Sequence, residues 1–151
     1  MTTATTERRG TFMSAAMLDA VRTDAVIHAL LVRADAGQRE VFLMLRARTG
    51  RADGTWAMPA GRIESGETLR AAVVREVREE LDVEADASSL AWLHSHHDGD
   101  REHHVVRVGA WSRELRNAEP DRCDDVRWFS ITALPSPMVP WVRDSIGRSV
   151  E

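Results

Sequence analysis

The 151-residue chain contains no lysine and no tyrosine, and its only cysteine is Cys123. Without lysine there is no Schiff-base mechanism and no phosphate-binding lysine of the Walker type. A single cysteine excludes an intramolecular disulfide and any zinc site built from several thiolates, and it is typical of a reducing compartment. Long apolar runs are also missing, since none approaches the roughly 20 residues of a membrane span.

The composition is that of one ordinary globular domain. Hydrophobic residues make up 43% of the chain and charged residues 29%, and a chain of about 150 residues can bury a core. The 24 acidic residues outnumber 20 arginines, which gives a formal net charge of −4. Because proteins that bind nucleic-acid polymers are usually basic, we expect a small-molecule partner, with no nucleic-acid polymer and no membrane.

Residues 1–20 are expected to form a flexible N-terminal tail, and residues 21–151 the folded domain. The tail contains Arg8 and Arg9 followed by a short apolar stretch. A twin-arginine export signal needs a longer apolar region and a small-residue cleavage site, so the sequence favours a cytoplasmic protein.

Apolar periodicity predicts an α/β domain. Four segments rich in β-branched residues predict the strands of two hairpins, 25–32 with 41–45 and 90–96 with 104–111. Val73, Val77 and Leu81 repeat every four residues and predict a helix over 68–82. Weaker signals predict a short strand at 56–59, a last strand at 126–129 and a C-terminal helix at 139–148. This order favours a mixed β-sheet between helical layers.

Three glutamates lie on one side of the predicted helix 68–82. Glu76, Glu79 and Glu80 are spaced i, i+3 and i+4, so they share an arc of roughly 100° beside the apolar stripe. Like charges at this spacing destabilise a helix by a few tenths of a kcal/mol. A divalent cation such as Mg²⁺, which prefers oxygen ligands, would reverse that effect. A solvated acidic face is the alternative for such a helix taken alone.

The same segment resembles the signature of the Nudix family. That signature is a glycine, five residues, a glutamate, seven residues and then Arg-Glu-apolar-x-Glu-Glu-x-Gly-apolar. Residues 61–67 (GRIESGE) and 75–83 (REVREELDV) match every defined position but one, where Asp82 replaces the final glycine. A glycine there would end the helix in the left-handed conformation. Aspartate tolerates that conformation less well, although better than most residues, so we expect an altered helix end and an intact metal site. The resemblance implies a Nudix α/β/α sandwich, a mixed β-sheet between helices, over roughly residues 22–149.

Nudix enzymes hydrolyse a nucleoside diphosphate linked to another group, X, with Mg²⁺ or Mn²⁺. The resemblance implies five metal-binding residues: Gly61 through its carbonyl oxygen, Glu76, Glu79 and Glu80 directly, and Glu67 through water. Arg75 would orient the carboxylates through ion pairs. The metal would polarise phosphoryl oxygens and activate the attacking water.

Members of the family often use one further carboxylate from outside the signature, as a ligand or a base. Glu102 is the first candidate, because it follows the turn at Asp98 and begins a strand that is expected beside the site. Asp98, Asp100 and Glu119 are weaker candidates. A solvated hairpin residue is the alternative interpretation of Glu102.

Candidate substrate contacts fall into two groups. An arginine fork matches phosphate oxygens, and Arg48 is preferred over Arg46 and Arg51, with a solvated strand face as the alternative. The resemblance to MutT-like members implies that the segment near the last strand and the start of the last helix line a base pocket. The candidates there are Asn117, Glu119, Met138 and Trp141. A core position is the alternative for the last two, although tryptophan is a good stacking platform.

Five histidines occupy one predicted hairpin, at positions 94, 96, 97, 103 and 104. A zinc site needs three or four convergent ligands, and strand alternation divides these rings between two faces. Substrate contact or a surface position is therefore favoured over metal binding.

Subgroup signatures favour a nucleoside or deoxynucleoside triphosphate as the substrate, with a monophosphate and pyrophosphate as products. The diadenosine-polyphosphate subgroup has a downstream tyrosine, which this chain lacks, and the ADP-ribose subgroup has a proline that is missing around Asp98. The alternatives are a nucleotide sugar, another nucleotide of a biosynthetic pathway, or a non-catalytic regulator that binds nucleotides. Monomer and homodimer both remain open.

Overall fold

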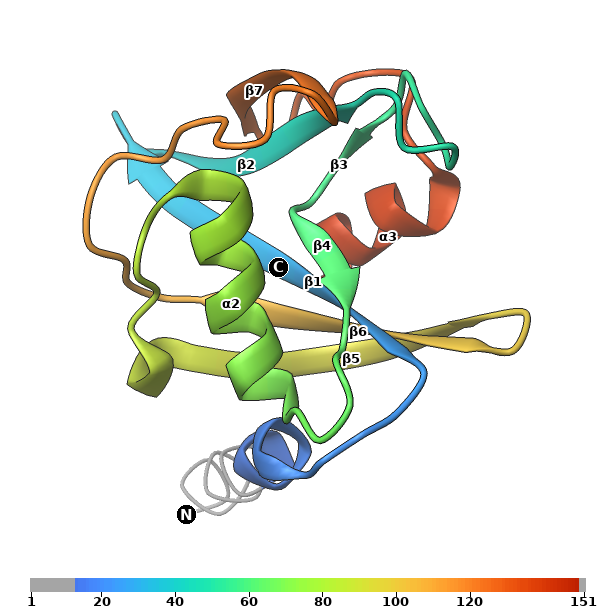
Figure 1. Cartoon of the computed structure of the whole chain (residues 1–151). Coiled ribbons are helices and arrows are strands. Elements are labelled where there is room, and N and C mark those ends of the chain that lie inside the picture. The colour runs from blue at the N-terminus through green and yellow to red at the C-terminus, as the bar shows by residue number, and fades with distance from the viewer. Residues whose placement is uncertain (1–12, 150–151) are drawn as a thin grey trace.

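The structure is a computed structural model that describes residues 13–149, and it places a mixed β-sheet between helices (Figure 1). The strands are β1 (Ala25–Asp35), β2 (Gln38–Arg46), β3 (Trp56–Ala57), β4 (Ala60–Arg62), β5 (Leu90–Asp98), β6 (Arg101–Val108) and β7 (Cys123–Ser130). The helices are α2 (Leu69–Leu81), the 3-10 turn η1 (Ala87–Ser89) and α3 (Pro140–Ser149). The predicted α/β class with a mixed sheet is confirmed.

The sheet has the order β3-β2-β1-β6-β5, with β4 paired to β1 and β7 paired to β2. β1 and β6 are parallel, and the remaining pairs are antiparallel. Both predicted hairpins are present as β1–β2 and β5–β6. β6 ends at Val108, so Trp111, the last residue of the predicted strand 104–111, lies beyond the observed strand and forms an isolated bridge with Ala85.

Strand alternation divides the core between two faces of the sheet. On β1, Ile27 and Ala29 pack on the side of α2, together with Val73 and Val77. Leu30, on the opposite face of β1, packs with Ile146 of α3. The same alternation applies to the functional residues, because neighbours along one strand point to opposite faces.

The N-terminal region differs from the expected tail. Residues 13–19 form a helix, and Leu18 is only 1% exposed within the core beside α2. Asp19 forms an ion pair of 2.7 Å with Arg70 of α2, and the Ser14 hydroxyl accepts a hydrogen bond of 2.9 Å from the Trp92 amide. Tertiary contacts order this segment. Residues 1–12, which include the paired arginines, lie outside the described residues.

Within residues 13–149 no helix combines the length and the apolar character that crossing a membrane requires.

Val77→Ala is expected to lower the free energy of unfolding by about 1–3 kcal/mol, because it removes buried methyl groups and leaves a cavity. Val77 is fully buried, whereas Val74 is only partly buried against the same core. Val74→Ala is therefore the matched control and should cost less. Urea unfolding of both variants measures the difference, and equal losses would contradict the packing described here.

Candidate active site

Helix α2 begins and ends at residues suited to those places. The Thr68 hydroxyl accepts a hydrogen bond of 3.1 Å from the Ala71 amide, which caps the N-terminus. Asp82 closes the helix in the left-handed conformation, with φ 56° and ψ 41°, and its amide donates to the Arg78 carbonyl. The aspartate therefore ends the helix as a glycine would. Its carboxylate also pairs with Arg116 at 2.8 Å.

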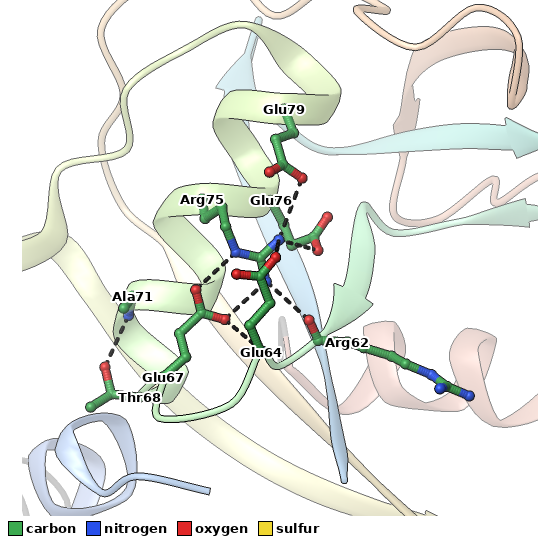
Figure 2. Close-up of polar contacts among 8 residues, drawn as sticks. All are labelled: Arg62, Glu64, Glu67, Thr68, Ala71, Arg75, Glu76 and Glu79. Carbon is green, nitrogen blue, oxygen red and sulfur yellow. Dashed lines mark hydrogen bonds and ion pairs between the residues drawn. The ribbon is translucent and has the colours of Figure 1, made fainter. Parts of the chain in front are cut away.

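Arg75 connects α2 to the loop that precedes it (Figure 2). Its guanidinium donates to both carboxylate oxygens of Glu67, at 2.8 and 2.9 Å, and to the Arg62 carbonyl at 3.0 Å. It also contacts Glu76 at 2.8 Å and Glu79 at 3.4 Å. Arg75 thus contacts three glutamates at once, which agrees with the orienting role that the resemblance implies. Both carboxylate oxygens of Glu67 accept hydrogen bonds from Arg75, so this carboxylate is not oriented to bind a metal ion directly.

Glu76 and Glu80 point their carboxyl groups toward β4. Burial is the largest cause that raises the pKa of Glu76, and Arg75 opposes it. Burial also raises the pKa of Glu80 well above its usual value, and the charges of Glu76 and Glu119 add to that effect. The Glu80 carboxylate accepts a hydrogen bond of 3.1 Å from the Ala60 amide of β4. Both side chains are therefore held in place while their negative charges remain poorly compensated.

Gly61 is the residue of β4 that makes room for these carboxylates. It pairs with Ile27, so its missing side chain would project toward α2. A Cβ atom at this position would lie 2.1 Å from the carboxyl carbon of Glu76. A side chain at Gly61 would therefore force the Glu76 carboxylate to move, whereas the backbone angles of Gly61 are not left-handed and do not call for glycine.

Glu119, in the loop between β6 and β7, is the outside carboxylate that joins this group. The Ala118 amide donates to the carbonyl oxygen of Glu80 at 2.9 Å, which ties the loop to the end of α2. The charge of Glu119 raises the pKa of both Glu76 and Glu80. Burial raises the pKa of Glu119 itself, with Arg122 opposing and Glu79 adding to the shift.

Glu102, the first candidate from the sequence, is engaged elsewhere. Its carboxylate lies 3.1 Å from Nε2 of the buried His104, on the far side of β1 from β4. This pairing with His104 favours Glu119 over Glu102 as the outside carboxylate, and the choice between them stays a prediction. The hairpin register directs Glu102 toward His104, and this could not be read from its position after the turn.

The residues fit a divalent cation in their chemistry. Glu76, Glu79, Glu80, Glu119 and the Gly61 carbonyl offer only oxygen donors, which Mg²⁺ prefers. The crowded carboxylates and the cleared space at Gly61 agree with a cation between them. Within residues 13–149, however, no set of three or more His, Cys, Asp or Glu side chains already converges as a complete metal site.

Arg48 and Asn117 brace the loop that carries Glu119. Arg48 donates to the carbonyl oxygens of Asp121 and Pro120, at 2.8 and 2.9 Å, and forms an ion pair of 2.8 Å with Asp124. The Asn117 side chain donates to the Cys123 carbonyl at 2.9 Å. The guanidinium of Arg48 is thus bound to this loop, which disfavours the predicted contact with a phosphate without testing it.

Met138 and Trp141 are both partly buried against the core on the α3 face. His96 stacks on the indole of Trp141, with ring centroids 4.6 Å apart and planes at 12°. His28 meets the same ring edge-on at 4.9 Å, and its Nε2 lies 2.9 Å from Nδ1 of His103.

His28 is a residue that the sequence reasoning missed. It is only 7% exposed, and burial lowers its pKa to about 3, with nearby histidines and Arg46 adding to the shift. The alternation of side chains along β1 could have indicated this position, because His28 lies two residues before Leu30 and therefore points to the same α3 face.

The NUDIX domain family model matches residues 22–148. The chain is 35% identical over 97 residues to the ADP-ribose pyrophosphatase of Methanocaldococcus jannaschii, a match that covers 62% of this chain and 57% of that relative. It is 32% identical over 76 residues to the CTP pyrophosphohydrolase of Escherichia coli, covering 49% and 54% of the two chains. These matches span little more than half of the relatives' length.

Among solved structures, the MutT NUDIX hydrolase from Burkholderia pseudomallei is similar over 86% of this chain and 99% of its own. The TM-score is 0.72 and the sequence identity 27%.

Gly61→Ala is expected to lower the affinity for Mg²⁺ by about tenfold or more, because the new methyl group displaces the Glu76 carboxylate. Titration with Mn²⁺ followed by electron paramagnetic resonance measures the loss. The control is Gly147→Ala, where an added Cβ meets nothing within 4 Å. Unchanged metal affinity in Gly61→Ala would place the cation away from Glu76.

Proposed function

Because the chain belongs to the NUDIX domain family, we propose that it is a Mg²⁺-dependent hydrolase of a nucleoside diphosphate linked to a group X. Mn²⁺ is the alternative cofactor. The observation that carries the proposal is the enclosed group of Glu76, Glu80 and Glu119 beside Gly61. Buried carboxylates that raise each other's pKa are costly unless a cation compensates them. The proposed setting is the cytoplasm, which the single cysteine supports.

The proposed ligands are the carboxylates of Glu76, Glu79 and Glu80 and the carbonyl oxygen of Gly61. When bound, the cation polarises phosphoryl oxygens and lowers the pKa of the attacking water. Arg75 and the Ala60 amide hold Glu76 and Glu80 in place beforehand, so little reorganisation is needed on binding.

Glu119 is proposed as the group that accepts the proton of the attacking water. Its pKa is raised by burial and by Glu79, and a carboxylate with a raised pKa is a better general base near neutral pH. Its loop is tied to α2 through Ala118, which holds the carboxylate beside the proposed metal ligands.

The preferred substrate is a nucleoside or deoxynucleoside triphosphate, cleaved to a monophosphate and pyrophosphate. Similarity to the CTP pyrophosphohydrolase of Escherichia coli and to a MutT structure supports this choice. Similarity to an ADP-ribose pyrophosphatase supports the second candidate, in which X is a sugar or another nucleotide-linked group. A regulator without catalysis is less favoured, because it would not need the crowded glutamates.

Glu80→Gln should keep the fold and lower turnover by about 100-fold or more, since it removes one charged ligand. The assay is release of pyrophosphate or phosphate from triphosphates, ADP-ribose, nucleotide sugars and dinucleoside polyphosphates with Mg²⁺ or Mn²⁺. Glu114→Gln is the matched control, because Glu114 is exposed and lies outside the site. Near-normal turnover in Glu80→Gln would refute the site.

Glu119→Gln and Glu102→Gln separate the two outside carboxylates. We expect a loss of about tenfold to 100-fold in kcat for the first, because it removes the proposed proton acceptor, and a change below about threefold for the second. The measurement is kcat for the best substrate of the screen. The opposite ranking would return the role to Glu102.

A further inference from the structure

The face of the sheet opposite the glutamates carries a row of basic side chains. Strand register places Arg62 of β4 and His103 of β6 on either side of Val26, and His96 of β5 opposite His103. Arg101 precedes His103 by two residues, so it lies on the same face. Figure 2 shows the Arg62 side chain extending away from the carboxylates.

A third arginine joins this row from the loop between β2 and β3. Arg51 and Arg62 lie near enough to Arg101 for their charges to lower its pKa, in addition to burial. Arg51 and Arg101 act on His103 in the same direction. Three segments that are distant in sequence therefore bring positive charges near one another, on the side of His103 where Arg101 lies.

These three arginines form no ion pair within the described part of the chain. Seven other arginines form ion pairs there, namely Arg33, Arg48, Arg70, Arg75, Arg78, Arg116 and Arg127. Asp24 acts electrostatically on Arg101 and Asp98 on His103, but neither residue forms an ion pair with the cluster among residues 13–149. Gathered like charges repel each other and favour a bound anion.

We propose that Arg51, Arg62 and Arg101 bind a phosphate group of the substrate that lies outside the cleaved phosphoanhydride bond. This inference rests on the proposed function. Strand β4 connects the two sites, because Gly61 faces the glutamates and Arg62, the next residue, faces the arginine cluster. Guanidinium forks bind phosphate oxygens in pairs. The phosphate is either the terminal group of a triphosphate or one carried by X.

The first test measures binding of inorganic pyrophosphate by calorimetry in EDTA, which removes any divalent cation that could bridge the anion to the glutamates. Arg51→Gln, Arg62→Gln and Arg101→Gln should each weaken binding by about tenfold. Arg113→Gln is the control, because this exposed arginine lies near Glu84 at the other end of α2. No binding by the wild type, or equal binding by all variants, would overturn the proposal.

The second test identifies where the phosphate comes from and separates this proposal from the proposed function. Arg101→Gln should raise KM with little change in kcat. An increase in KM that is limited to triphosphates assigns the bound phosphate as the terminal one. NADP⁺ and NAD⁺ differ only by one phosphate, so an increase in KM for NADP⁺ but not for NAD⁺ assigns a phosphate on X. Glu80→Gln should lose turnover yet still bind pyrophosphate in EDTA. Failure of the proposed function and failure of the arginine site would therefore be seen in different measurements.

Discussion

The site depends on one guanidinium that stands among more carboxylates than it can neutralise. Arg75 contacts Glu67, Glu76 and Glu79 within ion-pair distance, and it holds the preceding loop through the Arg62 carbonyl. Glu67 neutralises most of the positive charge of Arg75, because both of its carboxylate oxygens accept hydrogen bonds from the guanidinium. Glu80 and Glu119 are left with raised pKa values in a partly buried setting. That residual negative charge is what makes a divalent cation the natural complement of this site.

Strand β4 links this group of charged residues to the rest of the sheet. Its Ala60 amide holds Glu80, its Gly61 leaves room for Glu76, and its Arg62 points its side chain to the opposite face (Figure 2). A three-residue strand thus borders an acidic group on one side and a basic group on the other. A phosphate chain with a bound metal ion needs acidic groups around the metal and basic groups around the phosphates. The two faces of β4 therefore suit a single extended ligand.

Much of the fold follows from local pattern. The period of four in Val73 and Val77, with Thr68 before it, predicts helix α2 to within a residue or two. Both hairpins also follow, because turn residues separate runs of β-branched residues. The helix over residues 13–19 does not follow, since its order comes from the burial of Leu18 and the pairing of Asp19 with Arg70. Such contacts join segments that are far apart in sequence.

The sequence by itself determined the three glutamates on one arc of α2 and the arginine beside them, because spacings of three and four residues have a fixed meaning on a helix. The altered helix end expected at Asp82 is wrong, because the aspartate adopts the left-handed conformation that a glycine would adopt there. Only the tertiary structure decided that the loop carrying Glu119 is bound to the end of α2 while Glu102 pairs with His104. It likewise decided that Arg48 braces a loop. These outcomes depend on strand register and loop paths, which bring together residues whose separation in sequence carries no geometric information.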